Sequence, residues 1–140
     1  LKSIGADDVI NYADVAVDKA IRAKTGSLLR GGGVEVVVNF TAGDSWAPSM
    51  RCVKRHGRLL CCGGTGGYQA VTDIPYLFTA EMSIVGSTGW TMADQQACLD
   101  LVAQGRLSPP IDRVVPLSQG IDAVRAIEER GVFGKVIVTP

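Results

Sequence analysis

A nearly continuous run of β-branched residues, Val34-Glu-Val-Val-Val-Asn-Phe40, most constrains the fold of this chain. Such a run is typical of a strand that is covered on both faces, as in a parallel sheet. A helical pattern from about Ser45 to Arg55 follows, with Asp44 as the expected N-cap, and then a second apolar run, Arg58-Leu-Leu-Cys-Cys62. Because strand and helix keep alternating, we predict a parallel, doubly wound α/β sheet with right-handed crossovers.

The remaining segments follow the same alternation. Upstream, we expect a short strand over Asp8–Tyr12 and then a helix that Asp14 caps and Gly26 ends. Downstream, we expect helices over Ile74–Glu81 and Ala93–Gln104, and a further helix that Ser118 caps and Gly131 ends. Strands are expected over Met82–Val85, Ile111–Leu117 and Lys135–Thr139.

Composition excludes several classes of function. Fourteen basic and fourteen acidic side chains cancel, and the only basic cluster is Lys54-Arg55-His56, so we expect no nucleic-acid partner. No apolar run approaches the roughly 18 residues that span a bilayer, so we expect no membrane partner either. The chain begins Leu-Lys-Ser-Ile-Gly without an initiating Met, and we therefore expect a fragment of something longer. A small-molecule ligand fits best.

The cysteines do not suggest a metal site. Cys52, Cys61, Cys62 and Cys98 show no C-x-x-C spacing, and the only histidine is His56. We expect buried or reduced thiols, no zinc in this chain and a cytoplasmic location.

The stretch Cys61-Cys-Gly-Gly-Thr-Gly-Gly-Tyr-Gln69 invites a test as a phosphate-binding loop. A dinucleotide fingerprint needs Gly-x-Gly-x-x-Gly at the start of a helix, and here Gly64-Thr-Gly66 lacks the third glycine. No Gly-Lys-Ser/Thr ending is present for a P-loop. The triplet Gly31-Gly-Gly33 precedes a strand and is better interpreted as a turn.

Small residues follow three successive predicted strands, at Thr41-Ala-Gly43, Gly63-Gly-Thr65 and Ser87-Thr-Gly89. In open α/β sheets, ligands lie across the carboxyl ends of the strands, where glycine lets the backbone approach a flat ring. Small residues are also ordinary turn formers, so spacing alone leaves both interpretations open.

Several motifs together resemble the medium-chain dehydrogenase/reductase superfamily, in the group of zinc-type alcohol dehydrogenases and quinone oxidoreductases. The resemblance covers essentially the whole chain but only the second half of the family's pattern. The motifs are Leu1-Lys-Ser-Ile-Gly-Ala-Asp-Asp-Val-Ile-Asn-Tyr12, Gly33–Phe40, Gly57-Arg-Leu-Leu60 with Gly63-Gly64, Ile84-Val-Gly-Ser87, Gly105-Arg-Leu107 with Ile111-Asp-Arg113, and Gly134-Lys-Val-Ile-Val138.

The resemblance implies a Rossmann-like sheet that lacks its first two strands over residues 1–88. It implies a helix-strand-helix-strand segment over residues 89–140, which in the family rejoins the substrate domain. The residues that it would place beside NAD or NADP are Phe40, Thr41, Ala42, Cys62, Gly63, Gly64, Ser87, Thr88, Gly89 and Lys135. For Lys135 a solvated surface charge is the alternative, and where the family's alcohol dehydrogenases have a pyrophosphate-binding Arg this chain has Val138.

The resemblance also implies an NAD(P)-dependent oxidoreductase acting on alcohols, aldehydes, ketones or quinones. The glycine turn, the zinc ligands and the proton-relay residues of the family have no counterpart here, so we expect weak or no coenzyme binding and no independent activity. A non-catalytic dimerisation module is the alternative function. Because Val34–Phe40 would lack its native neighbour, we expect a homo-oligomer.

Overall fold

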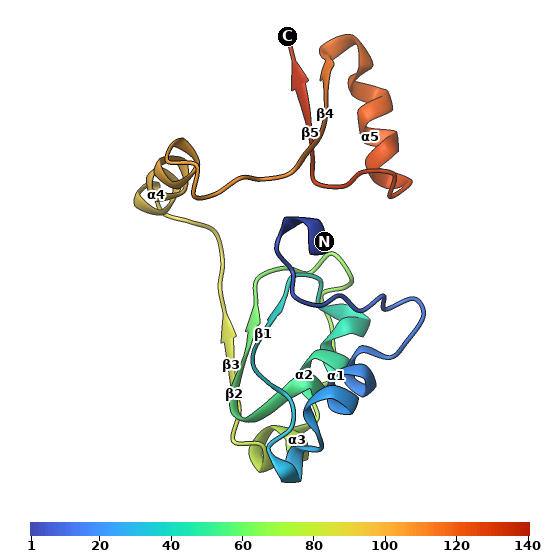
Figure 1. The fold of residues 1–140 in the computed structure, drawn as a ribbon, viewed down its shortest axis with the longest axis vertical. Coiled ribbons are helices and arrows are strands. Elements are labelled where there is room, and N and C mark those ends of the chain that lie inside the picture. The colour runs from blue at the N-terminus through green and yellow to red at the C-terminus, as the bar shows by residue number, and fades with distance from the viewer. The chain divides into compact units, whose positions relative to one another are not determined.

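The computed structural model describes all 140 residues and divides them into two compact units, Leu1–Gly89 and Trp90–Pro140. Each unit alternates helices and parallel strands (Figure 1). None of the helices has the length and apolar character that a bilayer crossing requires. The first unit contains η1 (Lys2–Ile4), α1 (Val17–Thr25), η2 (Leu28–Arg30), β1 (Val34–Asn39), η3 (Gly43–Ser45), α2 (Trp46–Cys52), β2 (Val53–Cys61), α3 (Ile74–Thr79) and β3 (Ser83–Gly86), where η denotes a short 3-10 helix.

The three strands of the first unit form one parallel sheet in the order β1-β2-β3. Val37 pairs with Leu59, and Leu59 pairs with Ile84, so the strand ends that follow these residues lie side by side. Helices pack on one face of this sheet, and the core between them contains Met50, Val53, Leu59, Ala80 and Met82. The expected α/β architecture with a parallel sheet is confirmed, with helices on one face of the sheet.

The opposite face of the sheet is uncovered, which corrects the expectation of a strand buried on both faces. Val36 and Val38 are 43% and 46% exposed, and Phe40 is 65% exposed. Side chains of a strand alternate between faces, and on the helix side Val37 packs against the core and Asn39 is buried. The apolar side chains of Val36, Val38 and Phe40 therefore lie on a face that no helix of the first unit covers.

The strand predicted over Asp8–Tyr12 does not form. These residues have no regular secondary structure, and the expected cap residue Asp14 instead accepts a hydrogen bond from the Asn11 side chain. A strand needs a hydrogen-bonding neighbour, and β1 pairs only with β2. The helix that follows is present as α1, with Ala16 as its N-cap and Gly26 as its C-cap.

The boundary between α2 and β2 lies earlier than predicted. The helix ends at Cys52, because Val53 already pairs with Val34 of β1. Residues 54–57 form an irregular start to β2, in which His56 has φ +62° and its N–H donates to the Ala80 carbonyl. The expected N-cap Asp44 lies inside η3, and Ser45 occupies the cap position.

The second unit has the predicted helix-strand-helix-strand order: α4 (Met92–Ala103), β4 (Ile111–Pro116), η4 (Leu117–Gln119), α5 (Gly120–Glu128) and β5 (Lys135–Thr139). Strands β4 and β5 form a separate parallel pair, and Ala123 of α5 is buried. Ser118 lies within η4, so it is not the N-cap of the following helix as predicted.

Candidate functional site

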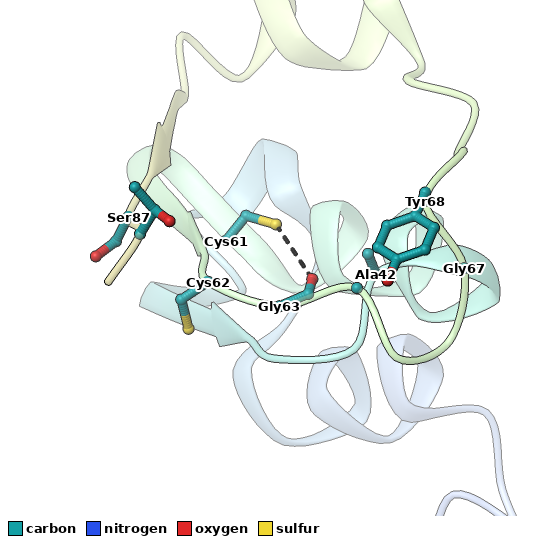
Figure 2. A pocket seen from close by; sticks show the side chains of 9 residues that line it. Ala42, Cys61, Cys62, Gly63, Gly67, Tyr68 and Ser87 are labelled. Carbon is teal, nitrogen blue, oxygen red and sulfur yellow. Dashed lines mark hydrogen bonds between the residues drawn. The ribbon is translucent and has the colours of Figure 1, made fainter. Parts of the chain in front are cut away.

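A pocket of about 370 Å³ opens at the carboxyl ends of β1, β2 and β3. Figure 2 shows Tyr68 beside Ala42 on one side and Ser87 on the other, with Cys61, Cys62 and Gly63 between them. All of the lining residues belong to the first unit. They are Ala42, Cys61, Cys62, Gly63, Gly64, Gly67, Tyr68, Ser87 and Thr88.

The loops after β1 and β2 meet backbone to backbone, and glycine makes this possible. A Cβ on Gly63 would lie 2.0 Å from the Phe40 carbonyl oxygen, and one on Gly43 would lie 2.0 Å from the Gly66 carbonyl oxygen. The Gly66 N–H donates to the Thr41 carbonyl oxygen at 2.7 Å. Gly63 and Gly66 of the cluster therefore serve loop packing directly, one of the two roles that spacing alone left open for the small residues after this strand.

Tyr68 stands over the glycine loop with its side chain 98% exposed. Its ring covers Gly64, where an added Cβ would lie 2.9 Å from the ring carbon Cδ1. Gly67 precedes it with φ +135°, a conformation that other residues rarely adopt, and its N–H donates to the Gly64 carbonyl oxygen at 3.0 Å. This turn places an aromatic ring at the rim of the pocket.

Hydrogen bonds between neighbouring strand ends fix the floor of the pocket. The Cys62 N–H donates to the Asn39 carbonyl oxygen at 3.2 Å, and the Ser87 N–H donates to the Cys61 carbonyl oxygen at 2.9 Å. The Cys61 thiol contacts the Gly63 carbonyl oxygen at 3.8 Å (Figure 2). The ladder of the sheet thus continues one residue beyond β2 and β3 into the pocket.

The pocket lining carries no charged side chain. Its polar groups are the hydroxyls of Tyr68, Ser87 and Thr88, the two thiols and the backbone. Such a surface suits a small flat ring with hydrogen-bonding substituents and offers no cation to a phosphate.

Six of the ten predicted site residues line this pocket, and four do not. The six are Ala42, Cys62, Gly63, Gly64, Ser87 and Thr88. Phe40 and Thr41 lie just before Ala42 in the loop after β1, and Gly89 ends the first unit. Lys135 begins β5 in the second unit. The coenzyme contacts of all ten residues stay a prediction.

Cys61, Gly67 and Tyr68 line the pocket but were missed. The sequence could have indicated Gly67 and Tyr68, because both belong to the glycine-rich stretch that follows the strand at Arg58–Cys62. Cys61 opens the same stretch, but as the last residue of β2 it was interpreted as part of the strand.

The residues present do not fit a zinc ion. No three His, Cys, Asp or Glu side chains come together in a way that could hold a metal. Cys52 is buried, and burial raises the pKa of its thiol above the usual value, which disfavours the thiolate that binds metals.

The chain is similar in sequence to a known family of dehydrogenases. Residues 4–138 match the family model of the zinc-binding dehydrogenases. The chain is 28% identical to quinone oxidoreductase-like protein 2 of Bos taurus over 145 residues, which cover 96% of this chain and 40% of that protein.

Solved structures of dehydrogenases and reductases also match the chain. A crystal structure of an NAD-dependent alcohol dehydrogenase matches with 30% identity and a TM-score of 0.83, over 99% of this chain and 39% of that one. The 2-octenoyl-CoA carboxylase reductase CinF, solved in complex with NADP and 2-octenoyl-CoA, matches with 27% identity and a TM-score of 0.81, over 98% of this chain and 34% of that one.

The chain thus spans about 40% of the length of the curated relatives that it matches. Over that length the order of elements, the sequence motifs and the family match agree. The chain belongs to the zinc-binding dehydrogenase family, within the medium-chain dehydrogenase/reductase superfamily.

Proposed function

We propose that this chain forms the nicotinamide-facing part of the coenzyme domain of an NAD(P)-dependent oxidoreductase. The observation that carries the proposal is the uncharged pocket at the carboxyl ends of three adjacent parallel strands. In open α/β sheets this edge is where ligands bind. The NADP bound to the structural relative CinF supports the same coenzyme class.

The pocket's own residues would hold and orient the nicotinamide ring. Ala42 and Gly63 present a small side chain and bare backbone against which a flat ring can lie. Ser87 and Thr88 offer hydroxyls that can donate to or accept from its carboxamide. When bound, the nicotinamide supplies or accepts a hydride, and the substrate would be an alcohol, aldehyde, ketone or quinone.

These residues alone would bind the coenzyme weakly. Much of a dinucleotide's orientation comes from its pyrophosphate, which needs backbone N–H groups at a helix N-terminus or a cation. The pocket lining offers neither a helix start nor a cation. We therefore expect millimolar affinity and no turnover by the 140 residues themselves.

Calorimetry with NADH and NADPH tests the proposal. The unaltered chain should release heat at millimolar coenzyme, and Ser87→Trp should abolish it, because an indole at this position fills the pocket. Ser27→Trp is the matched control, since Ser27 is exposed and begins η2 away from the pocket. Circular dichroism checks that both variants fold. Equal coenzyme affinity in Ser87→Trp and the unaltered chain would overturn the assignment of this pocket.

A non-catalytic association module is the second candidate, and the uncovered sheet favours it. Strand β1 lies at an edge of its sheet, and its neighbouring face exposes Val36 and Val38. Exposed apolar edge strands invite pairing with another chain, so we expect a homo-oligomer. A monodisperse monomer in light scattering at micromolar concentration would contradict this expectation.

We also propose a reducing compartment such as the cytoplasm. All four cysteines are free thiols, and Cys62 and Cys98 are exposed to solvent. Exposed free thiols are uncommon where disulfides form readily. Thiol titration of the freshly isolated protein should find four reactive groups after unfolding.

A further inference from the structure

Asn39 is the one buried polar or charged residue of the chain, with 4% exposure. It ends β1, a strand that is otherwise rich in valine. A polar side chain in such a place costs free energy unless hydrogen bonds satisfy it, so its partners indicate what it does.

Both ends of the Asn39 amide are fully used. Its Oδ1 accepts from the N–H groups of Thr41 and Ala42, at 2.9 and 2.7 Å. Its Nδ2 donates to the hydroxyls of Ser45 and Ser49, each at 2.9 Å. The two backbone N–H donors fix which end of the amide is the oxygen. One side chain therefore ties the loop after β1 to helix α2.

The loop that Asn39 holds is strained. Ala42 has φ +53° and ψ −143°, a conformation that residues with a Cβ rarely adopt. Such backbone persists only where surrounding contacts impose it, and it concentrates at functional sites. The hydrogen bond from the Ala42 N–H to Asn39 and that from the Ser45 hydroxyl to the Ala42 carbonyl oxygen, at 2.7 Å, supply those contacts.

The strained residue and the next strand end both border the pocket. Ala42 lines it, and so does Cys62, whose N–H donates to the Asn39 main-chain carbonyl oxygen. Asn39 itself is not part of the lining. Asn39 therefore bonds to two of the residues that line the pocket without lining it itself.

We propose that Asn39 is a positioning residue, which holds Ala42 in its strained conformation and thereby shapes the pocket to accept a nicotinamide ring. The inference rests on the proposed function for the identity of the ring. The first part of the inference, that Asn39 orders the loop, can be measured without any ligand.

Amide hydrogen exchange measures the ordering of the loop. In Asn39→Leu, which has similar size but no acceptor, exchange at the Thr41 and Ala42 amides should accelerate about tenfold relative to the Leu59 amide. In Asn39→Asp the ratio should stay near that of the unaltered chain, because a carboxylate accepts both N–H groups and the Ser49 hydroxyl can turn to donate to it, while the Ser45 hydroxyl keeps its bond to the Ala42 carbonyl oxygen. The ratio to Leu59 separates loop disorder from a general loss of stability.

A control variant removes a part-buried hydrogen-bonding group elsewhere in the first unit. The Tyr76 hydroxyl lies near the start of β2, with the carbonyl oxygen of Val53 at 3.3 Å, at the end opposite the pocket. Tyr76→Phe should lower stability and leave the ratio of Ala42 to Leu59 exchange unchanged. If Asn39→Leu does not fold, Asn39→Ser, which is too short to span both N–H groups, should show the same acceleration.

Affinity for reduced nicotinamide mononucleotide tests the link to the ligand. We expect the dissociation constant to rise about tenfold in Asn39→Leu and to change little in Asn39→Asp and Tyr76→Phe. A folded Asn39→Leu with unchanged exchange ratio or unchanged affinity would overturn the proposal. Absence of binding by the unaltered chain would contradict the proposed function instead, while the exchange ratio would still decide whether Asn39 orders the loop.

Discussion

The carbonyl oxygen of Phe40 lies against the backbone of Gly63, so closely that a Cβ on Gly63 would approach it to 2.0 Å. This contact joins the end of β1 to the end of β2 through backbone alone. It explains one glycine of the cluster after β2 without a phosphate. The glycine loop builds the pocket wall, and its sequence matches neither the dinucleotide fingerprint nor a P-loop.

Gly63→Ala should therefore destabilise the chain by about 1–3 kcal/mol, because a backbone carbonyl cannot move aside as a flexible side chain can. Gly86→Ala is the matched control. A Cβ on Gly86 meets nothing within 4 Å, so this variant should be neutral or gain about 0.5 kcal/mol in strand β3. Urea denaturation of both variants measures the difference, and equal stabilities would show that the two loops do not meet as described.

Ala42→Gly should stabilise the fold by about 1 kcal/mol. Glycine adopts the positive φ of this position without a Cβ clash, and this relief exceeds the added flexibility of the unfolded chain. Thermal unfolding followed by circular dichroism checks the sign. A loss of stability would mean that Ala42 is not strained in solution.

Asp18→Asn should lower stability near neutral pH by about 1 kcal/mol. Asp18 of α1 accepts a hydrogen bond from the Arg51 guanidinium of α2 at 2.8 Å, and its side chain is only 14% exposed. Burial raises the pKa of this carboxyl, but the hydrogen bond and charge of Arg51 outweigh it and lower the pKa below 3.8.

The lowered pKa of Asp18 determines how the stability of the chain depends on pH. A folded-state pKa below the unfolded value adds stability that is fully present above about pH 4 and is lost as pH falls through the folded pKa. The difference between Asp18→Asn and the unaltered chain should thus shrink in acid. Asp122→Asn, in an exposed pair with Arg125, should cost less than about 0.5 kcal/mol. A difference that is constant from neutral pH to pH 3 would contradict the role of this ion pair.

The sequence predicted a helix or strand correctly where turn-forming residues mark both ends of the segment. The bounds of β5, Lys135–Thr139, agree with the prediction, because Gly134 with φ +102° and Pro140 bracket the strand. Predictions of helix starts were less accurate. Asp44 and Ser118 are both typical N-caps, yet each lies in a 3-10 turn that precedes its helix, and no sequence pattern marks such a turn.

Predictions that needed a partner element failed. Asp8–Tyr12 has the composition of a strand but no neighbour to pair with, and Val36 and Val38 have the composition of a buried strand but no covering layer. The composition of a segment indicates what it can form, whereas a strand also needs a partner to pair with and a layer to pack against.

The sequence predicted where the candidate site lies, but it did not identify all of its residues. Small residues after three strands indicated the edge of the sheet, and Ala42, Gly63 and Ser87 do meet there. Asn39 was not selected, although a single amide in a run of valines was a signal. Its importance depends on a loop conformation that only the structure shows.

The most direct test of nicotinamide binding is an amide chemical-shift titration of the isotopically labelled chain with reduced nicotinamide mononucleotide, with ADP as the control for the other half of the coenzyme. We predict saturable shifts at millimolar ligand that concentrate at Ala42, Cys62, Gly63, Gly64, Ser87 and Thr88, and no such shifts with ADP. No shift at these amides, or an equal response to ADP, would contradict a nicotinamide site at the ends of β1, β2 and β3.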